Sequence, residues 1–190
     1  MLEIVFLSKL LRGFPILFIL AIVIFAVFKL KKHNKEDAEK YRCLGYSLKR
    51  EKKYREAIDC FSKVIEYDSK DDLSYCIRGD IYKCLSEYDK AIKDYTKVIK
   101  LNPEDPHAYY NRGFCRLNNI LTVKDVDLEL YSGVSRLLAP LTCDDFCTAG
   151  VLYLKKGNKT EALKCVDNIK QADSSSPLIK KLMNKIYEEE

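Results

Sequence analysis

Apolar and polar residues alternate with a helical period along most of this chain. Tyr54, Ala57, Phe61 and Val64 are spaced three or four residues apart, which places them on one face of an α-helix. A short polar break at residues 51–53 separates this pattern from a similar one before it. The same alternation of apolar faces and breaks continues toward the C-terminus. The pattern predicts an all-α protein built from successive pairs of helices.

The pattern also repeats with a fixed step of 34 residues. The positions that keep this step are Tyr41, Tyr75 and Tyr109; Gly45, Gly79 and Gly113; Tyr54 and Tyr88; Ala57 and Ala91; Ile58 and Ile92; Val64 and Val98. A period of this length indicates one helix pair that has been copied and stacked, each copy burying its apolar face against the next. Stacked repeats present one long concave surface, so the period favours a binding protein over an enzyme.

These residues resemble the tetratricopeptide repeat family. Its pattern has Gly at position 8, Ala at position 20 and an aromatic residue at position 24, where this chain has Gly45, Ala57 and Phe61 in its first unit. Pro103 fits position 32 of the second unit. The resemblance implies a right-handed α-solenoid of about four helix pairs. The expected units are residues 38–71, 72–105, 106–142 and 143–176, followed by a capping helix at 177–190.

The third unit departs from the pattern after Asn119. Asp125 and Glu129 stand at its positions 20 and 24, and we expect a helix within residues 120–142 to pack in a modified register. Its expected apolar face consists of Leu128, Tyr131, Val134, Leu137 and Leu138. The step from Gly113 to Gly150 is 37 residues, which suggests an insertion of about three residues.

The fourth unit is expected to resume at Cys143. Gly150 and Ala162 have the same spacing as Gly45 and Ala57. The final helix is expected to begin at Pro177, with Ser176 as its N-cap.

An apolar stretch near the N-terminus, uncharged from Phe14 to Phe28, predicts a transmembrane helix at residues 14–30 if Lys29 snorkels. It follows a short segment at 1–13 and precedes a basic connector at 31–37. A cleaved signal peptide is the alternative, but bulky and basic residues occupy the place of a small-residue cleavage site. More Lys residues follow the stretch than Lys and Arg precede it, which favours a single-pass protein with its repeats in the cytoplasm.

Charge argues against a nucleic-acid partner. The formal net charge is +5, and residues 1–37 account for +3 of it. The rest of the chain is close to balance and lacks the excess of Lys and Arg that nucleic-acid binding requires. The basic residues beside the apolar stretch are better suited to anionic lipid headgroups.

Catalytic, cofactor and metal motifs are not apparent. The sequence has no Gly-rich phosphate loop, no G-x-S-x-G and no H-E-x-x-H, so we expect no enzyme activity and no cofactor. A nucleophile formed by His107 with Cys84 or Cys115 is disfavoured. The eight cysteines are scattered singly, which is more typical of small buried residues in a reducing compartment than of a metal site or disulfides.

The resemblance also implies which residues line a protein-binding groove, because the first helix of each unit faces the concave side. By that correspondence the groove residues are Arg42, Tyr46, Lys49, Arg50, Asp80, Lys83, His107, Tyr110, Phe114 and Leu117. This surface is basic at its N-terminal end and aromatic toward the third unit, a mixture suited to a peptide with an acidic end and apolar anchors. One family variant clamps chaperone C-termini, and here only Arg42 clearly agrees with its residues, whereas Tyr46, Ile77, His107 and Asn111 do not.

The sequence therefore predicts a membrane-tethered scaffold that binds a protein or peptide in its groove and recruits it to the membrane. Two alternatives remain open. One is an exported protein whose repeats face a lumen or the periplasm and act on envelope proteins, in which case some cysteines should be oxidised. The other is a structural subunit of a larger membrane complex, docked through the convex face or the irregular 120–142 helix.

Overall fold

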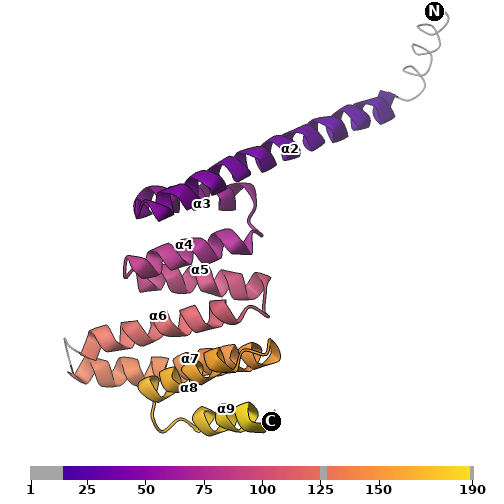
Figure 1. Cartoon of the computed structure of the whole chain (residues 1–190). Coiled ribbons are helices and arrows are strands. Elements are labelled where there is room, and N and C mark those ends of the chain that lie inside the picture. The colour runs from indigo at the N-terminus through magenta and orange to yellow at the C-terminus, as the bar shows by residue number, and fades with distance from the viewer. Residues whose placement is uncertain (1–14, 125–127, 189–190) are drawn as a thin grey trace, which may run out of the picture.

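A computed structural model describes residues 15–124 and 128–188, and every regular element in these ranges is a helix. Figure 1 shows the helices stacked in sequence order, with the N-terminal part of the first described helix projecting from the stack. The all-α repeat architecture is confirmed for this part of the chain. The helices are α2 (Pro15–Arg50), α3 (Tyr54–Tyr67), α4 (Asp72–Cys84), α5 (Tyr88–Leu101), α6 (Pro106–Lys124), α7 (Leu128–Lys155), α8 (Lys159–Ala172) and α9 (Pro177–Glu188).

Close helix contacts explain the glycines of the first two units. A Cβ added at Gly45 would lie 3.0 Å from ring atoms of Phe61, and one added at Gly79 would lie 3.1 Å from the ring of Tyr95. Both rings are fully buried. The glycine of the first helix thus makes room for the aromatic residue of the second, which is the packing that a dense core requires.

The turns inside three helix pairs have one shared geometry. Lys52, Ser86 and Gly157 have positive φ angles of 61°, 58° and 71°. In the first two turns, the next residue donates its backbone N–H to a carbonyl five residues earlier: Lys53 to Leu48 and Glu87 to Tyr82, each at 2.9 Å. This is the Schellman bond that ends a helix, and its left-handed residue is usually glycine.

We expect Ser86→Gly to stabilise the protein, because Ser86 pays a steric penalty in the left-handed region that glycine avoids. The gain in the free energy of unfolding should be about 0.5–1 kcal/mol, since the greater freedom of glycine in the unfolded chain offsets part of the relief. Urea unfolding monitored by circular dichroism measures it. Gly157→Ala is the reciprocal variant and should destabilise, and a destabilising Ser86→Gly would contradict the assigned turn.

The third unit differs from the sequence prediction. No break occurs near Cys143, because α7 continues as one helix of 28 residues through Pro140. The side chains of Leu128, Tyr131 and Val134, the expected apolar face, lie outside the described part of the structure. Leu137 is exposed rather than packed. The described residues between 120 and 142 therefore belong to the end of α6 and the beginning of α7, not to a separate second helix.

Helix α7 packs as a member of two pairs. Gly113 of α6 faces Asp145 and Phe146, with a Cβ at Gly113 placed 3.2 Å from each. A Cβ added at Gly150, further along α7, would lie 2.6 Å from Leu182 of α9 and 3.3 Å from Cys165 of α8. The partner of Gly113 is thus Phe146, 33 residues on, whereas Phe61 follows Gly45 by only 16. The extra residues account for the extended α6–α7 hairpin beside the stack in Figure 1.

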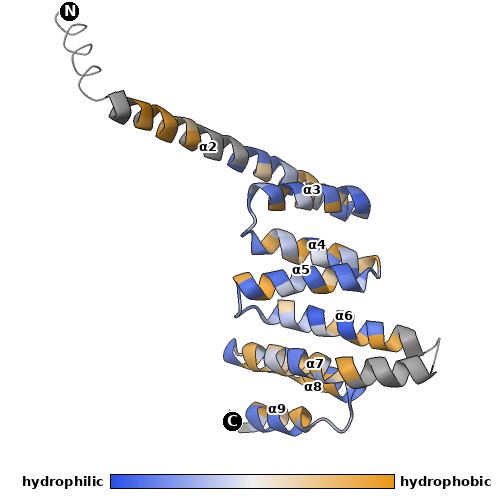
Figure 2. Ribbon diagram, turned by 180° about the vertical axis from the view of Figure 1, so that it is seen from behind, coloured by the Kyte–Doolittle hydropathy of each residue, from blue (hydrophilic) through white to orange (hydrophobic). Residues whose placement is uncertain are grey.

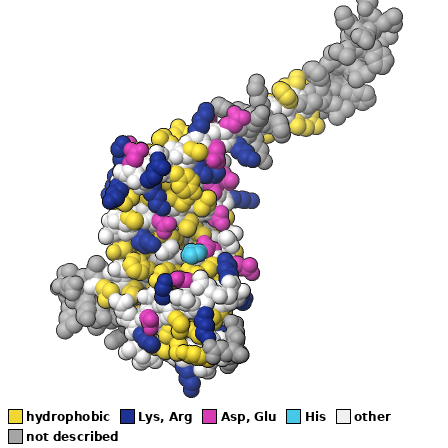
Figure 3. Space-filling view, viewed as in Figure 1, with side chains coloured by type: hydrophobic (Ala, Val, Ile, Leu, Met, Phe, Trp, Pro, Cys, Tyr) yellow, Lys and Arg dark blue, Asp and Glu magenta, His cyan; other side chains and the backbone are white. Residues whose placement is uncertain are grey.

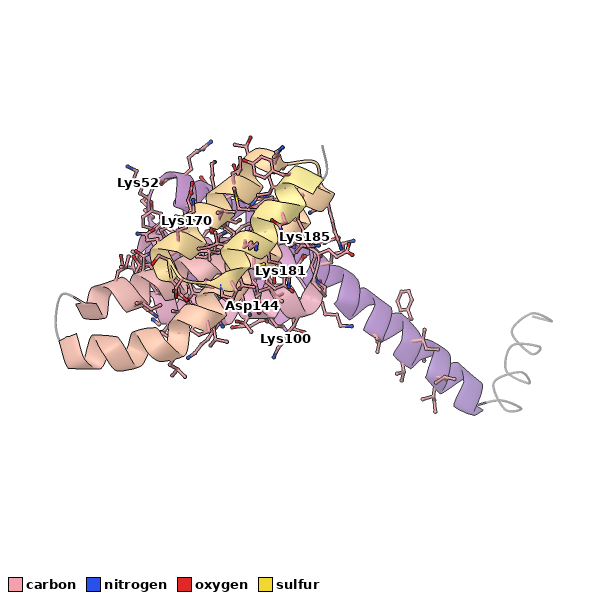
Figure 4. All side chains as sticks on the ribbon, turned by 90° about the horizontal axis from the view of Figure 1, so that it is seen from below. Lys52, Lys100, Asp144, Lys170, Lys181 and Lys185 are labelled. Carbon is pink, nitrogen blue, oxygen red and sulfur yellow. The ribbon has the colours of Figure 1, made fainter. Side chains whose placement is uncertain are left out.

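The C-terminal end of the stack is closed by α9. Leu182 and Ile186 of α9 are buried in the core that α7 and α8 also form. Ser176 accepts a hydrogen bond from the backbone N–H of Leu178 at 3.4 Å, as expected of an N-cap before Pro177. Figure 4 views this end of the molecule, where Lys181 and Lys185 mark the outer side of α9.

The N-terminal part of α2 is helical and strongly apolar. Its described side chains from Ile19 to Val27 are exposed, with Phe25 at 68%. Figure 2 shows this orange segment pointing away from the repeats. Among the described residues, a single stretch, Leu137–Lys155, is long and apolar enough to cross a membrane, and more than half of it is buried inside the domain, as in a core helix. The predicted segment at 1–13 lies outside the described residues.

Candidate binding groove

The first helices of successive units place several of the predicted groove residues in one row. Lys49 of α2 lies 3.9 Å from the Asp80 carboxylate of α4. Lys83 of α4 donates to the side-chain carbonyl of Asn111 in α6 at 2.7 Å and lies 5.7 Å from the ring centre of Phe114. Figure 3 shows hydrophobic side chains along one face of the stack with acidic and basic side chains among them. The row is therefore a continuous surface that crosses α2, α4 and α6.

Asp80 is the charged centre of this row. The hydroxyl of Tyr95 donates to it at 2.7 Å from behind, out of the core. The ammonium groups of Lys49 and Lys83 lie 3.9 Å and 3.7 Å from its two oxygens, longer than a good hydrogen bond. Two cations thus share one carboxylate, so the centre of the groove has a net positive charge. The two ammonium groups can still donate hydrogen bonds to a ligand.

Arg42 is paired with carboxylates of the protein itself, those of Glu39 and Asp71. It donates to Glu39 at 2.6 Å and to Asp71 at 2.8 Å, and Ser74 also donates to Asp71. The one residue that agrees with the chaperone clamp is thus already paired.

Tyr46 offers the groove an apolar surface. Its ring is 43% exposed and meets the ring of Phe61 edge-on at 5.6 Å. Partial burial raises the pKa of Tyr46, and nearby Arg42 opposes this shift, so the hydroxyl stays protonated near neutral pH. The exposed ring is available for contact with a peptide side chain.

The groove residues of the third unit contact helices beyond it. The His107 ring nitrogen Nδ1 lies 3.1 Å from the hydroxyl of Tyr153, and the Tyr110 hydroxyl accepts from Asn168 at 3.2 Å. Leu117 differs from the expectation: it is only 3% exposed and belongs to the core, so it has almost no surface for a ligand. It belongs to the same buried cluster as Cys143 and Phe146 of α7.

Sequence reasoning missed Asn111 and Asn168, which bond to groove residues, and Tyr153, which is only 4% exposed and contacts His107 from the core. Asn111 has no equivalent in the second unit, where Ile77 occupies the same position and is buried. Tyr153 and Asn168 come from α7 and α8, whose relation to α6 depends on the length of the hairpin. The 34-residue step carries no signal for either of them.

A buried polar ladder behind the groove joins the units. Arg78 binds Asp94 through two hydrogen bonds of 2.9 and 2.8 Å and reaches back to Ser62 of the preceding unit. These two carboxylate contacts raise the pKa of Arg78 despite its burial. Arg78 and Ser62 recur 34 residues later as Arg112 and Thr96, which are also bonded to each other.

Asp145 of α7 completes the second rung of the ladder. It accepts from Arg112 at 3.1 and 2.6 Å and from Arg116 at 2.6 Å. The 34-residue step would have placed this acid at Leu128, so the sequence pattern shows the arginine but not its partner. The contact fixes which part of α7 pairs with α6.

Most of the cysteines are packing residues. Five of the eight are buried, and burial raises the pKa of Cys76, Cys115 and Cys165 to about 12. A thiol with such a pKa is protonated at neutral pH and is a poor nucleophile. Among the described residues, no group of three His, Cys, Asp or Glu side chains is arranged to hold a metal ion.

We expect Cys43 and Cys84, the two exposed thiols, to react rapidly with Ellman's reagent at pH 8, and the others only as the protein unfolds. Because folding raises the thiol pKa values above the ordinary value of about 8.5, the folded state retains protons that the unfolded state releases. The free energy of unfolding should therefore fall as pH rises from about 8.5 toward 12. Mass spectrometry of the labelled protein identifies the sites, and fast labelling of Cys115 or Cys165 would contradict the packing.

Comparison with known proteins agrees with this geometry. Residues 44–71 match a model of the tetratricopeptide repeat, and residues 79–119 match a second model described as a TPR repeat. Both matches support the tetratricopeptide repeat (TPR) family. No curated protein matches the chain. The two matched segments cover the units whose glycine and aromatic contacts are most regular, and neither includes α7.

Solved structures, among them two TPR domains, have the same fold. The TPR2B domain of yeast Sti1 in its pHsp70 complex is 17% identical, with a TM-score of 0.57 over 74% of this chain and 99% of that one. PcrH, in complex with the chaperone binding region of PopD, is 15% identical, with a TM-score of 0.58 over 74% and 93%. The second TPR of Spaghetti, bound to an HSP90 peptide, is 22% identical, with a TM-score of 0.51 over 65% and 98%.

Proposed function

We propose that this protein is a membrane-tethered TPR adaptor that binds a protein or peptide in its groove and recruits it to the membrane. The observation that carries the proposal is the row of Lys49, Asp80, Lys83 and Phe114, in which charged and aromatic groups from three helices form one surface. Such a surface suits an extended or helical segment that contacts several repeats at once. No catalytic step is part of this role.

The ligand chemistry we propose is an acidic segment with an apolar anchor. A ligand carboxylate can bridge the ammonium groups of Lys49 and Lys83, and Tyr46 and Phe114 offer ring surface to its neighbours. The TPR domains of Sti1 and Spaghetti were solved with Hsp70 and HSP90 peptides, which supports peptide binding as a use of this fold. Because Arg42 is paired with Asp71, we place the acidic contact at Lys49 and Lys83.

Membrane tethering rests on the exposed apolar part of α2. Isolated exposed apolar residues are common, but the described side chains from Ile19 to Val27 are apolar and exposed on all sides of the helix. A helix that is apolar all round requires a nonpolar environment. Lipid is the occupant we favour, since the segment is uncharged and basic residues follow it. The heavier basic flank on the C-terminal side supports repeats that face the cytoplasm.

The test of the groove is binding of acidic peptides to the full-length chain in detergent. Peptides selected from a random library should share an acidic residue beside an aromatic or aliphatic one. The double variant Lys49→Ala, Lys83→Ala should weaken their binding by roughly tenfold or more, because it removes both charge-assisted contacts. Lys100→Ala removes a cation from the second-helix surface of α5 and should leave binding unchanged; Figure 4 shows Lys100 on the opposite side of the stack from Lys52.

Equal loss from the double variant and the control would indicate non-specific charge attraction and contradict the groove. The membrane half of the proposal is tested separately by flotation with phosphatidylcholine and phosphatidylserine vesicles. Full-length protein should float at high salt, and a chain without residues 1–34 should not.

The alternative role as an assembly subunit has one observation in its favour. The α6–α7 hairpin extends beside the stack, and Leu137 and Leu141, one turn apart on α7, are 71% and 48% exposed. Leu137→Glu with Leu141→Glu should disrupt a complex docked through this hairpin while leaving peptide binding in the groove intact. If this variant instead loses peptide binding in the groove while the complex stays intact, the adaptor role is favoured.

A further inference from the structure

Helix α2 contains both the apolar segment and the first helix of the first repeat. It runs from Pro15 to Arg50 without interruption, 36 residues or about 54 Å. Between Ile16 and Leu44 the sequence contains neither glycine nor proline, the residues that most often interrupt or kink a helix. The basic connector is therefore part of a helix and not a loose linker. Figure 1 shows this helix continuing from the stack.

The C-terminal part of α2 is fixed within the first repeat. Ala38 and Leu48 are buried, Gly45 contacts the ring of Phe61, and Tyr41 stacks on Tyr67 with ring centres 6.2 Å apart. The hydrogen bond from Arg42 to Asp71 adds a contact with the N-cap of α4. The direction of the repeat stack is thus fixed relative to the axis of α2.

We infer that α2 is a rigid strut that holds the groove at a set height and angle over the bilayer. The inference rests on the proposed membrane tether. Only residues 29–37, about 14 Å of helix, lie between the apolar segment and the first buried position at Ala38. Tyr46 and Lys49 follow Phe28 by about 27 and 32 Å along the same helix. The groove therefore opens close to the membrane and faces segments of its ligand that lie near the bilayer surface.

A flexible tether would behave differently. Nine residues of a Gly/Ser-type linker have a root-mean-square span of about 15–18 Å and no preferred direction. The repeats would then sample every tilt, including positions against the lipid. A strut restricts the repeats to one narrow range of heights, so the two cases are distinguished by a distance distribution and not by binding.

The test uses full-length protein in phosphatidylcholine nanodiscs. A donor dye is attached through an unnatural amino acid at the exposed position Lys170 of α8, and acceptor dyes are placed on the lipid headgroups. The helix-breaking variant is Lys32→Gly with His33→Pro, and its matched control is Lys32→Ala with His33→Ala. The wild type and the alanine control should give one narrow distance distribution. The Gly-Pro variant should broaden it and shift its mean toward the lipid by on the order of 10 Å, the free length of the strut.

Each outcome bears on a different part of the account. A wild-type distribution as broad as that of the Gly-Pro variant would overturn the strut and leave the tether intact. Failure of the wild type to enter nanodiscs or to float with vesicles would overturn the tether and the strut with it. Circular dichroism of both double variants should show folded repeats, so that a change in distance is not caused by unfolding.

Discussion

Asp145→Ala is expected to destabilise the protein by about 3–5 kcal/mol, the cost of breaking a buried ion pair from one side. Asp145 is 3% exposed and accepts hydrogen bonds from both Arg112 and Arg116. Its removal leaves two guanidinium groups in the interior without their shared carboxylate. Urea unfolding of the full-length chain in non-ionic detergent, followed by circular dichroism, measures the loss.

Asp144→Ala is the matched control. This neighbour is exposed, and Figure 4 shows it on the C-terminal side of the molecule. It should change the free energy of unfolding by less than about 0.5 kcal/mol, as most surface substitutions do. Similar small effects from both variants would mean that α7 does not pair with α6 through Asp145. The third unit would then have a different second helix.

Tyr95→Ala is expected to cost about 3–5 kcal/mol, because it removes a large and fully buried ring. The ring fills the space that Gly79 leaves, so its loss opens a cavity between α4 and α5. It also removes the hydroxyl that positions Asp80 in the groove. Thermal and urea unfolding should both report the change.

Tyr95→Phe separates packing from hydrogen bonding. It retains the ring, and it should cost only about 1 kcal/mol in stability because a single hydrogen bond is lost. The same variant should alter peptide binding, since Asp80 is then held only by Lys49 and Lys83. A stability loss in Tyr95→Phe equal to that in Tyr95→Ala would show that the hydroxyl, and not the ring, stabilises this contact.

The sequence predicted the first two units well because their contacts recur at one fixed step. Gly45 with Phe61 and Gly79 with Tyr95 are pairs that the step itself relates, and local packing makes them visible. The Arg78–Ser62 contact recurs as Arg112–Thr96 and could have been found in the same way.

The third unit could not be predicted in this way. Its acidic partner and its aromatic ring, Asp145 and Phe146, lie beyond the α6–α7 hairpin, whose length no periodicity records. The groove residues show the same difference between the first two units and the third. Lys49 and Lys83 both lie near Asp80, while Leu117 is buried and the partners of His107 and Tyr110 are Tyr153 and Asn168 of later helices. A repeat pattern gives positions within a unit but not the length of an insertion between its helices.

The most direct test of the adaptor is site-specific photocrosslinking in intact membranes. A benzoylphenylalanine residue replaces either Tyr46 on the groove or Tyr187 of α9, two tyrosines that are both exposed. The account predicts a discrete adduct from position 46 that an excess of selected acidic peptide abolishes, and no such adduct from position 187. Adducts from position 187 alone, or peptide-insensitive adducts from both positions, would contradict recruitment through the groove.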